Sequence, residues 1–117
     1  MEYLILIYGS EAQEAKMSQA ELGAIYQEYA GFTKSIHQSG NHRGGHQLQP
    51  VSTATTVRMR DGKRVVTDGP FAETREQLGG FYLIQAKDLD EALGIAERIP
   101  SARWGSIEVR PVVPPHS

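Results

Sequence analysis

The stretch that decides the fold is residues 66–84, which read VTDGPFAETREQLGGFYLI. Just before it, Asp61-Gly62 is a strong signal for a tight turn, so residues 64–67 are predicted to form the returning arm of a β-hairpin. The Gly69-Pro70 step then forces the chain to turn, and a polar segment follows. Residues 80–86 carry few charges and predict another strand.

Upstream of this stretch, the sequence predicts a strand, a helix and the first hairpin arm. Residues 3–8 form a near-continuous apolar run, which is typical of a central strand buried on both faces. A polar loop follows, and a capping box over residues 18–21 then begins a helix that Gly40 ends. Its apolar positions recur at helical spacing: Leu22, Ile25, Tyr26, Tyr29, Phe32 and Ile36. Residues 42–46 are interpreted as a polar, glycine-rich link, 47–49 as a short strand, and 52–60 as a strand.

Downstream, Asp88 is predicted to cap a second helix that ends at Pro100, and residues 105–112 are predicted to form the last strand. The order is that of an α+β, ferredoxin-like split βαβ domain with an inserted hairpin. Its helices are expected to cover one face of the sheet, and a second copy of the chain is the most economical cover for the other. We expect a single domain over residues 1–113 and a flexible tail over 114–117.

Composition excludes several classes of function. The chain has 117 residues, enough for one domain, and a net charge of -2, too little positive charge for direct nucleic-acid binding. The absence of cysteine excludes thiol chemistry, disulfides and cysteine-based metal sites. The apolar N-terminus is too short for a membrane span and lacks the basic region of a signal peptide, so we expect a cytoplasmic location without membrane association. Without a phosphate-binding glycine loop, no cofactor is expected.

The segment over residues 66–84 resembles the signature of the DGPF family within the YCII-related group. The likeness extends to the opening strand, to the helix start at residues 89–92 and to the ending over 107–112. It implies a ferredoxin-like fold that dimerises sheet to sheet as an α/β barrel. Most members have no assigned reaction, but relatives include a dehydrochlorinase that uses a His–Asp pair. Others lie beside or are fused to sigma factors, which implies a regulatory setting.

This chain lacks the His–Asp pair that the resemblance would supply. Counting back from Gly40 along the first helix puts Tyr29 at the place of the histidine. The Asp-Pro step after the second helix is here Ile99-Pro100. Chloride elimination is therefore not carried over to this chain.

Three residues are the candidates for acid–base chemistry. Asp68, at the end of the hairpin arm, is interpreted either as a general base or as an acceptor for the backbone amides of its own turn. His46 could exchange protons near neutral pH, and Tyr29 could donate a hydrogen bond. We expect these three side chains to share one cleft. If the motif is instead a folding device, Asp68 fixes the turn and Phe71 lies in the core.

Three further residues are candidate ligand-binding groups. Glu73 and Glu76 would share a face if their segment formed a helical turn, as an acid–base pair or a cation site, the alternative being a solvated loop. Arg110 could bind a carboxylate, or pair with Glu108 of a partner chain or with Asp68. No metal site is expected from His42 and His46, because glycines between them disfavour a helix. Trp104 is expected to be a packing anchor.

These residues lead to two hypotheses for function. The first is a small-molecule-binding homodimer with lyase-like acid–base chemistry near Asp68. The alternative is a non-catalytic regulatory or binding module associated with a sigma factor.

Overall fold

The N-terminal apolar run becomes β1 (Glu2–Gly9), a central strand of a four-stranded antiparallel sheet in the computed structural model, which describes residues 1–115. The elements in chain order are β1 (Glu2–Gly9), α1 (Glu11–Glu14), α2 (Gln19–Gln38), β2 (His42–Gln47), η1 (Val51–Thr53), β3 (Thr55–Arg60), β4 (Lys63–Asp68), β5 (Gln77–Gln85), α3 (Leu89–Ala96), η2 (Pro100–Arg103) and β6 (Ser106–Pro111). The sheet order is β2-β5-β1-β6, and β3 pairs only with β4. Because β5 lies between the two strands that α2 connects, the α+β arrangement is compatible with the ferredoxin-like prediction.

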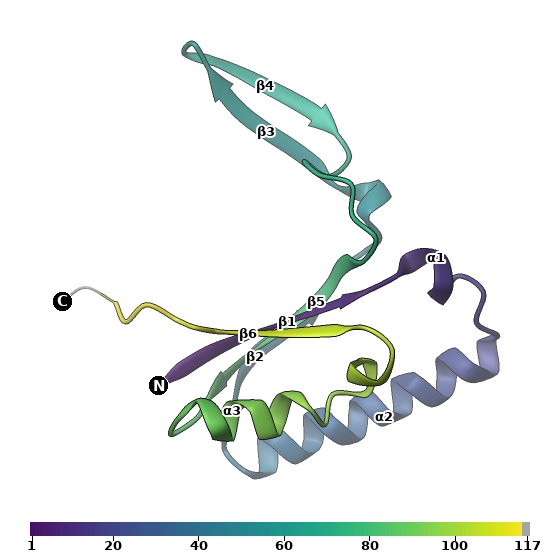
Figure 1. The fold of residues 1–117 in the computed structure, drawn as a ribbon, viewed down its shortest axis with the longest axis vertical. Coiled ribbons are helices and arrows are strands. Elements are labelled where there is room, and N and C mark those ends of the chain that lie inside the picture. Colours follow the sequence, from purple (N-terminus) through teal and green to yellow (C-terminus); the bar gives the residue numbers. More distant parts are fainter. Residues whose placement is uncertain (116–117) are drawn as a thin grey trace.

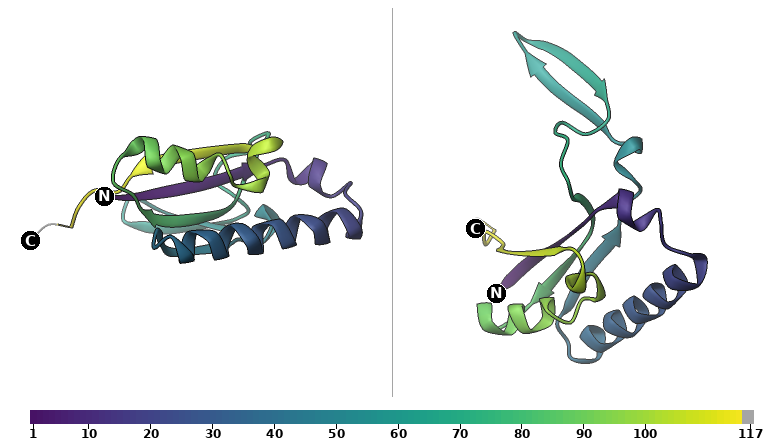
Figure 2. Two further views of the ribbon diagram at one scale, coloured as in Figure 1. Left: turned by 90° about the horizontal axis from the view of Figure 1, so that it is seen from below. Right: turned by 45° about the vertical axis from the view of Figure 1, so that its right-hand side comes forward.

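Helices α2 and α3 begin where the sequence predicts and lie on one face of the sheet (Figures 1 and 2). The Ser18 hydroxyl accepts from the Glu21 amide at 3.1 Å, and the Glu21 carboxylate accepts from the Ser18 amide at 3.3 Å, which confirms the capping box. Asp88 caps α3 by accepting from the Glu91 amide at 2.9 Å. Among residues 1–115, no helix combines the length and the apolar character that crossing a membrane requires.

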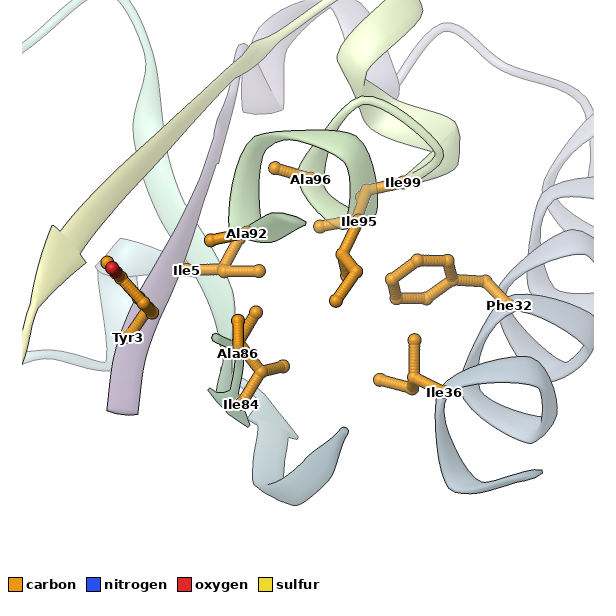
Figure 3. Close-up of a cluster of buried hydrophobic side chains, with 10 residues drawn as sticks. All are labelled: Tyr3, Ile5, Phe32, Ile36, Ile84, Ala86, Ala92, Ile95, Ala96 and Ile99. Carbon is orange, nitrogen blue, oxygen red and sulfur yellow. The ribbon is translucent and has the colours of Figure 1, made fainter. Parts of the chain in front are cut away.

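The hydrophobic core lies between this sheet face and the two helices (Figure 3). Its largest fully buried side chains are Ile5 of β1, Ile36 of α2, Ile84 of β5 and Ile99. Leu4 and Leu6 alternate with the buried positions of β1 and are only half-buried. The expectation that β1 is buried on both faces is therefore wrong for the single chain, because no element of residues 1–115 covers the second face.

Three local predictions need correction. Residues 42–46 belong to edge strand β2 rather than to a link, and this strand ends at Gln47 instead of beginning there. Its glycines permit the pairing, because a Cβ atom on Gly45 would lie 2.8 Å from the Phe81 carbonyl oxygen of β5. The strand predicted over 52–60 begins only at Thr55, after the turn η1. The loop predicted before α2 contains the short helix α1, capped by Ser10.

The β3–β4 hairpin is confirmed and extends away from the helices (Figure 1). Asp61 and Gly62 both have positive φ, 52° and 73°, as the tight turn requires. Along its two strands, four apolar side chains are exposed: Val57 and Met59 on β3, and Val65 and Val66 on β4. An isolated two-stranded hairpin is marginally stable at best, so contact with another surface would stabilise this arm.

Candidate functional site

A cavity of about 790 Å³ lies between the N-terminal half of α2 and the sheet, and we call it the α2 cavity. Helix α2 lines it with Leu22, Ile25, Tyr26, Tyr29 and Thr33, and η2 and the residue after it contribute Ser101 and Trp104. The strands contribute several glycines, Gly9, Gly45, Gly79 and Gly80, which have no side chains to fill the space.

The cavity exists because only the C-terminal half of α2 packs on the core. Phe32 and Ile36 are buried, whereas Leu22, Ile25 and Tyr29 are half-buried and Tyr26 is 55% exposed. The predicted apolar face of the helix is therefore real, but its first two turns cover a hollow instead of side chains of the sheet. Short α1 closes one end, where the Glu11 carboxylate accepts from the Val51 amide at 3.1 Å.

Two phenols in the cavity are held by hydroxyl partners. The Tyr29 hydroxyl hydrogen-bonds the Ser101 hydroxyl, and the Tyr82 hydroxyl bonds Thr33 at 2.7 Å. Burial raises the pKa of both phenols. Both are therefore neutral at physiological pH and able to donate hydrogen bonds to a bound molecule.

Glu14 is one of two carboxylic acids in the wall of the cavity, the other being Glu11. Burial, followed by the nearby Glu11 carboxylate, raises the pKa of Glu14. Its side chain takes part in no hydrogen bond or ion pair within residues 1–115, and a methyl group built on Gly9 would be 2.5 Å from its Oε1. The Glu14 carboxyl is thus an unengaged acid that titrates above its usual range.

Trp104 lines the cavity with an unused hydrogen-bond donor. Its indole nitrogen is buried and has no partner among the described residues. The Arg103 guanidinium lies 5.2 Å from the ring centroid and is paired with Glu28 at 2.5 Å. A buried donor without an acceptor is uncommon, and a bound molecule could supply the acceptor.

His42, on β2, also lines the cavity. Its ring stacks on that of His37 from α2, with centroids 3.8 Å apart. Burial, followed by His37 and Arg43, lowers the pKa of His42. This imidazole is therefore mainly neutral at pH 7.

The structure does not bring together the three predicted acid–base residues within one chain. Tyr29 lies in the α2 cavity, but Asp68 is exposed at the end of β4. His46 pairs with Phe81, and their ring centroids are 6.0 Å apart. Because the neighbouring Tyr82 packs on Phe32 of α2, Phe81 and His46 must face the opposite side of the sheet. His46 is among the residues that line the cavity, but its ring lies against Phe81 on the far side of the sheet.

The predicted ligand-binding residues also lie outside the cavity. Glu73 is exposed, and the segment around Glu76 forms no helix, so the premise of a shared helical face is wrong. Arg110 of β6 is exposed opposite Leu4, on the sheet face away from the helices. Within residues 1–115, no three His, Cys, Asp or Glu side chains are grouped in a way that would hold a metal ion.

The turn after Asp68 is held by its backbone. The Gly69 amide donates to the Ala54 carbonyl at 2.7 Å, and the Thr56 hydroxyl donates to the Gly69 carbonyl at 2.8 Å. Gly69 has φ 95°, which favours glycine. Phe71 is 79% exposed, so its predicted place in the core is wrong for the single chain.

We expect Asp68→Asn to change the free energy of unfolding by less than about 0.5 kcal/mol, because exposed side chains outside hydrogen-bond networks contribute little. Urea unfolding followed by circular dichroism measures this. Gly69→Ala is the matched comparison and should be clearly destabilising, because alanine is strained at positive φ. A loss for Asp68→Asn as large as that for Gly69→Ala would show that the carboxylate itself fixes the turn.

Glu14→Gln is expected to stabilise the protein at neutral pH and to have little effect in acid. A carboxyl group whose pKa is raised by folding favours the folded state while protonated, and this contribution is lost as the pH rises through the folded-state pKa. Because glutamine stays neutral, the melting temperature of the variant relative to wild type should increase from about pH 4 to pH 7. Glu97→Gln, on exposed Glu97 at the end of α3, is the control. A pH-independent difference would contradict the burial of Glu14.

Comparison with known proteins assigns the whole described chain to one family. The family model of the YCII-related domain matches residues 1–115. An uncharacterized protein of Rhizobium meliloti (strain 1021) is 38% identical over 114 residues, which are 96% of this chain and 92% of that protein.

Proposed function

Because the chain belongs to the family of proteins with a YCII-related domain, we propose that it binds a small organic molecule in the α2 cavity and that Glu14 and Tyr29 supply acid–base groups there. The observation that carries this proposal is the buried, unpartnered indole nitrogen of Trp104 in the wall of the cavity. Its unused donor calls for an acceptor on a ligand.

The size and lining of the cavity support this proposal. Small-molecule sites typically enclose about 300–1,000 Å³ and combine apolar walls with a few polar groups. The α2 cavity falls in this range, with aromatic and aliphatic side chains from α2 and polar groups from Glu14, Tyr29, Ser101 and Trp104. A carboxyl group with a raised pKa in such a place is a common feature of acid–base sites.

The contact between Tyr29 and Ser101 supports the same location. Tyr29 stands where the resemblance places a histidine, and Ser101 directly follows the Ile99-Pro100 step that replaces the Asp-Pro step. These two stretches meet beneath α2 through the Tyr29–Ser101 hydrogen bond. The phenol of Tyr29 and the hydroxyl of Ser101 thus lie where the resemblance would place the His–Asp pair. This difference in side chains supports a reaction other than chloride elimination.

Fluorescence of Trp104, the single tryptophan of the chain, provides the test. Titration with a panel of small aromatic alcohols, acids and amines should give a saturable change in emission for at least one compound. Tyr29→Phe should weaken that binding about two- to tenfold, the range for one lost hydrogen bond. Tyr3→Phe should leave it unchanged, because within residues 1–115 the Tyr3 hydroxyl hydrogen-bonds only the Met1 sulfur, at 3.8 Å. A titration with no saturable response to any compound would refute the proposal.

The uncovered sheet face supports the further proposal of a homodimer arranged as an α/β barrel. Leu4, Leu6, Phe81 and Leu83 form an apolar stripe across this face, and His46, Glu108 and Arg110 flank it. A second copy would cover the stripe and allow the exposed hairpin to contact its partner. Light scattering should give twice the mass of one chain, and Leu83→Glu should give a monomer. A monomeric wild-type chain at every concentration would overturn the dimer.

In such a dimer, Asp68 could contribute to ligand binding in the partner's cavity. If the hairpin of one chain carries Asp68 to the partner's cavity, Asp68→Asn should weaken ligand binding without changing stability. Unchanged binding would place Asp68 outside the site.

The exposed apolar residues of the hairpin favour the alternative function, a regulatory module that binds another protein such as a sigma factor. Affinity capture from a lysate with wild type and with Val66→Ser distinguishes this alternative from the small-molecule proposal. Recovery of a sigma factor by wild type alone would support this alternative, and equal recovery by both would exclude the hairpin as its contact.

A further inference from the structure

The charges that line the α2 cavity have one sign. The chain contains 12 Lys and Arg residues, yet none of them lines the cavity. The acidic residues in its wall are Glu11 and Glu14, both from α1. His42 adds little positive charge at pH 7, because burial and the neighbouring His37 and Arg43 lower its pKa.

The arginine next to Trp104 does not offset these carboxylates. Arg103 stacks on Trp104 from outside the cavity and is already paired with Glu28 at 2.5 Å. An anionic ligand in the cavity would therefore lose its hydration without gaining a cationic partner, which is strongly unfavourable. Sites for carboxylates and phosphates normally supply arginine or lysine for this reason.

The remaining wall is suited to a cation attached to an apolar body. Tyr26, Tyr29, Tyr82 and Trp104 all line the cavity, and the faces of such rings attract ammonium groups. Glu14 is available to bind one, because it has no hydrogen bond or ion pair within residues 1–115. Its position over Gly9 keeps it at the sheet surface, where the cavity ends at α1.

We infer that the α2 cavity selects a small organic monocation, an ammonium group on an aromatic or apolar body that also carries a hydrogen-bond acceptor for the Trp104 indole, over neutral and anionic molecules of the same shape. The ammonium group binds Glu14, and the apolar body packs against the tyrosines of α2. This inference rests on the proposed function and names the class of its ligand.

Three probes that share a 3-hydroxyphenyl ring, whose hydroxyl can accept from the Trp104 indole, differ in charge and test the inference. They are 3-hydroxybenzylamine, 3-hydroxybenzyl alcohol and 3-hydroxybenzoate, called benzylamine, benzyl alcohol and benzoate below. Each is titrated into the full chain at pH 7 and followed by Trp104 fluorescence and by isothermal calorimetry. Benzylamine should bind about tenfold more tightly than benzyl alcohol, because charge-assisted contacts are the stronger ones, and benzoate should bind most weakly. If benzoate binds as tightly as benzylamine, the inference fails and the proposed function stands. If no probe binds, both fail.

Two variants show whether Glu14 is the selecting group. Glu14→Gln keeps the shape of the side chain and should reduce benzylamine affinity about tenfold while leaving benzyl alcohol affinity unchanged. Glu97→Gln removes the same charge from the exposed end of α3 and should change neither. An equal loss for all probes in Glu14→Gln, or an unchanged preference for the amine, would refute the role of the Glu14 charge.

Discussion

Replacing Ile36 by alanine should lower the free energy of unfolding by about 2–5 kcal/mol, the range for large-to-small changes in a closed core. Ile36 has no exposed surface and packs in the cluster that contains Ile5, Ile84 and Ile99. It also belongs to the only part of α2 that is anchored on the sheet, since the first turns of the helix cover the cavity. Removing the Ile36 side chain should therefore also loosen the N-terminal half of α2, which lines the α2 cavity. Urea unfolding followed by circular dichroism measures the effect.

Ile25→Ala is the matched control, because it makes the same chemical change on the same helix. Ile25 is half-buried at the margin of the α2 cavity, so less apolar surface returns to water and no closed cavity forms. Its loss of stability should be clearly smaller than that of Ile36→Ala. Equal losses would mean that the cavity is closed by packing and does not exist as described.

Gly105→Ala should destabilise the protein by about 1–3 kcal/mol, the usual cost of forcing an extra group into a packed site. A Cβ atom on Gly105 would lie 2.2 Å from the Tyr8 carbonyl oxygen and 3.3 Å from that of Ser101. Both are backbone atoms, so relief requires β6 or η2 to move. Because Ser101 and Trp104 lie in the displaced segment, the emission maximum of Trp104 should shift as well. Thermal unfolding and fluorescence spectra measure these two effects.

The comparison is Gly23→Ala on α2. No atom lies within 4 Å of a Cβ built on Gly23, and the residue is exposed. Alanine there should raise the free energy of unfolding by up to about 1 kcal/mol through its better helix propensity. If Gly105→Ala were as stable as Gly23→Ala, with unchanged emission, the close approach of β1 and β6 at this point would be wrong.

Sequence patterns that span only a few residues predicted the starts of α2 and α3 and the hairpin turn correctly. The capping box at Ser18, the Asp88 cap and the Asp61-Gly62 turn each depend on contacts three or fewer residues away, and all three form as expected. The apolar sequence of β1 likewise predicted that its side chains on the helix-covered face are buried. Residues 42–46 were mistaken for a link because their glycines read locally as flexible, whereas pairing with β5 makes them a strand.

The candidate site depended on distant pairings and was predicted only in part. Tyr29 was identified through the family resemblance, but its partner Ser101 lies 72 residues away in the sequence. Glu14 lies in a segment interpreted as a loop, and the free indole nitrogen of Trp104 becomes apparent only when its surroundings are known. No local pattern marks such residues.

The helices capped by Ser18 and Asp88, the central strand and the hairpin turn could be predicted from the sequence, because their physical causes lie within short segments, whereas α1 and β2 could not. Which side chains face one another depends on how distant segments pair, and this became known from the three-dimensional structure. His46 illustrates the reason: His42 stacks on His37 of α2, and strict alternation would place His46 on that same face. A shift of register between His42 and Gly44 turns His46 to the opposite face, away from Tyr29. One extra residue in a paired strand thus separates two side chains that the sequence had suggested would share a cleft.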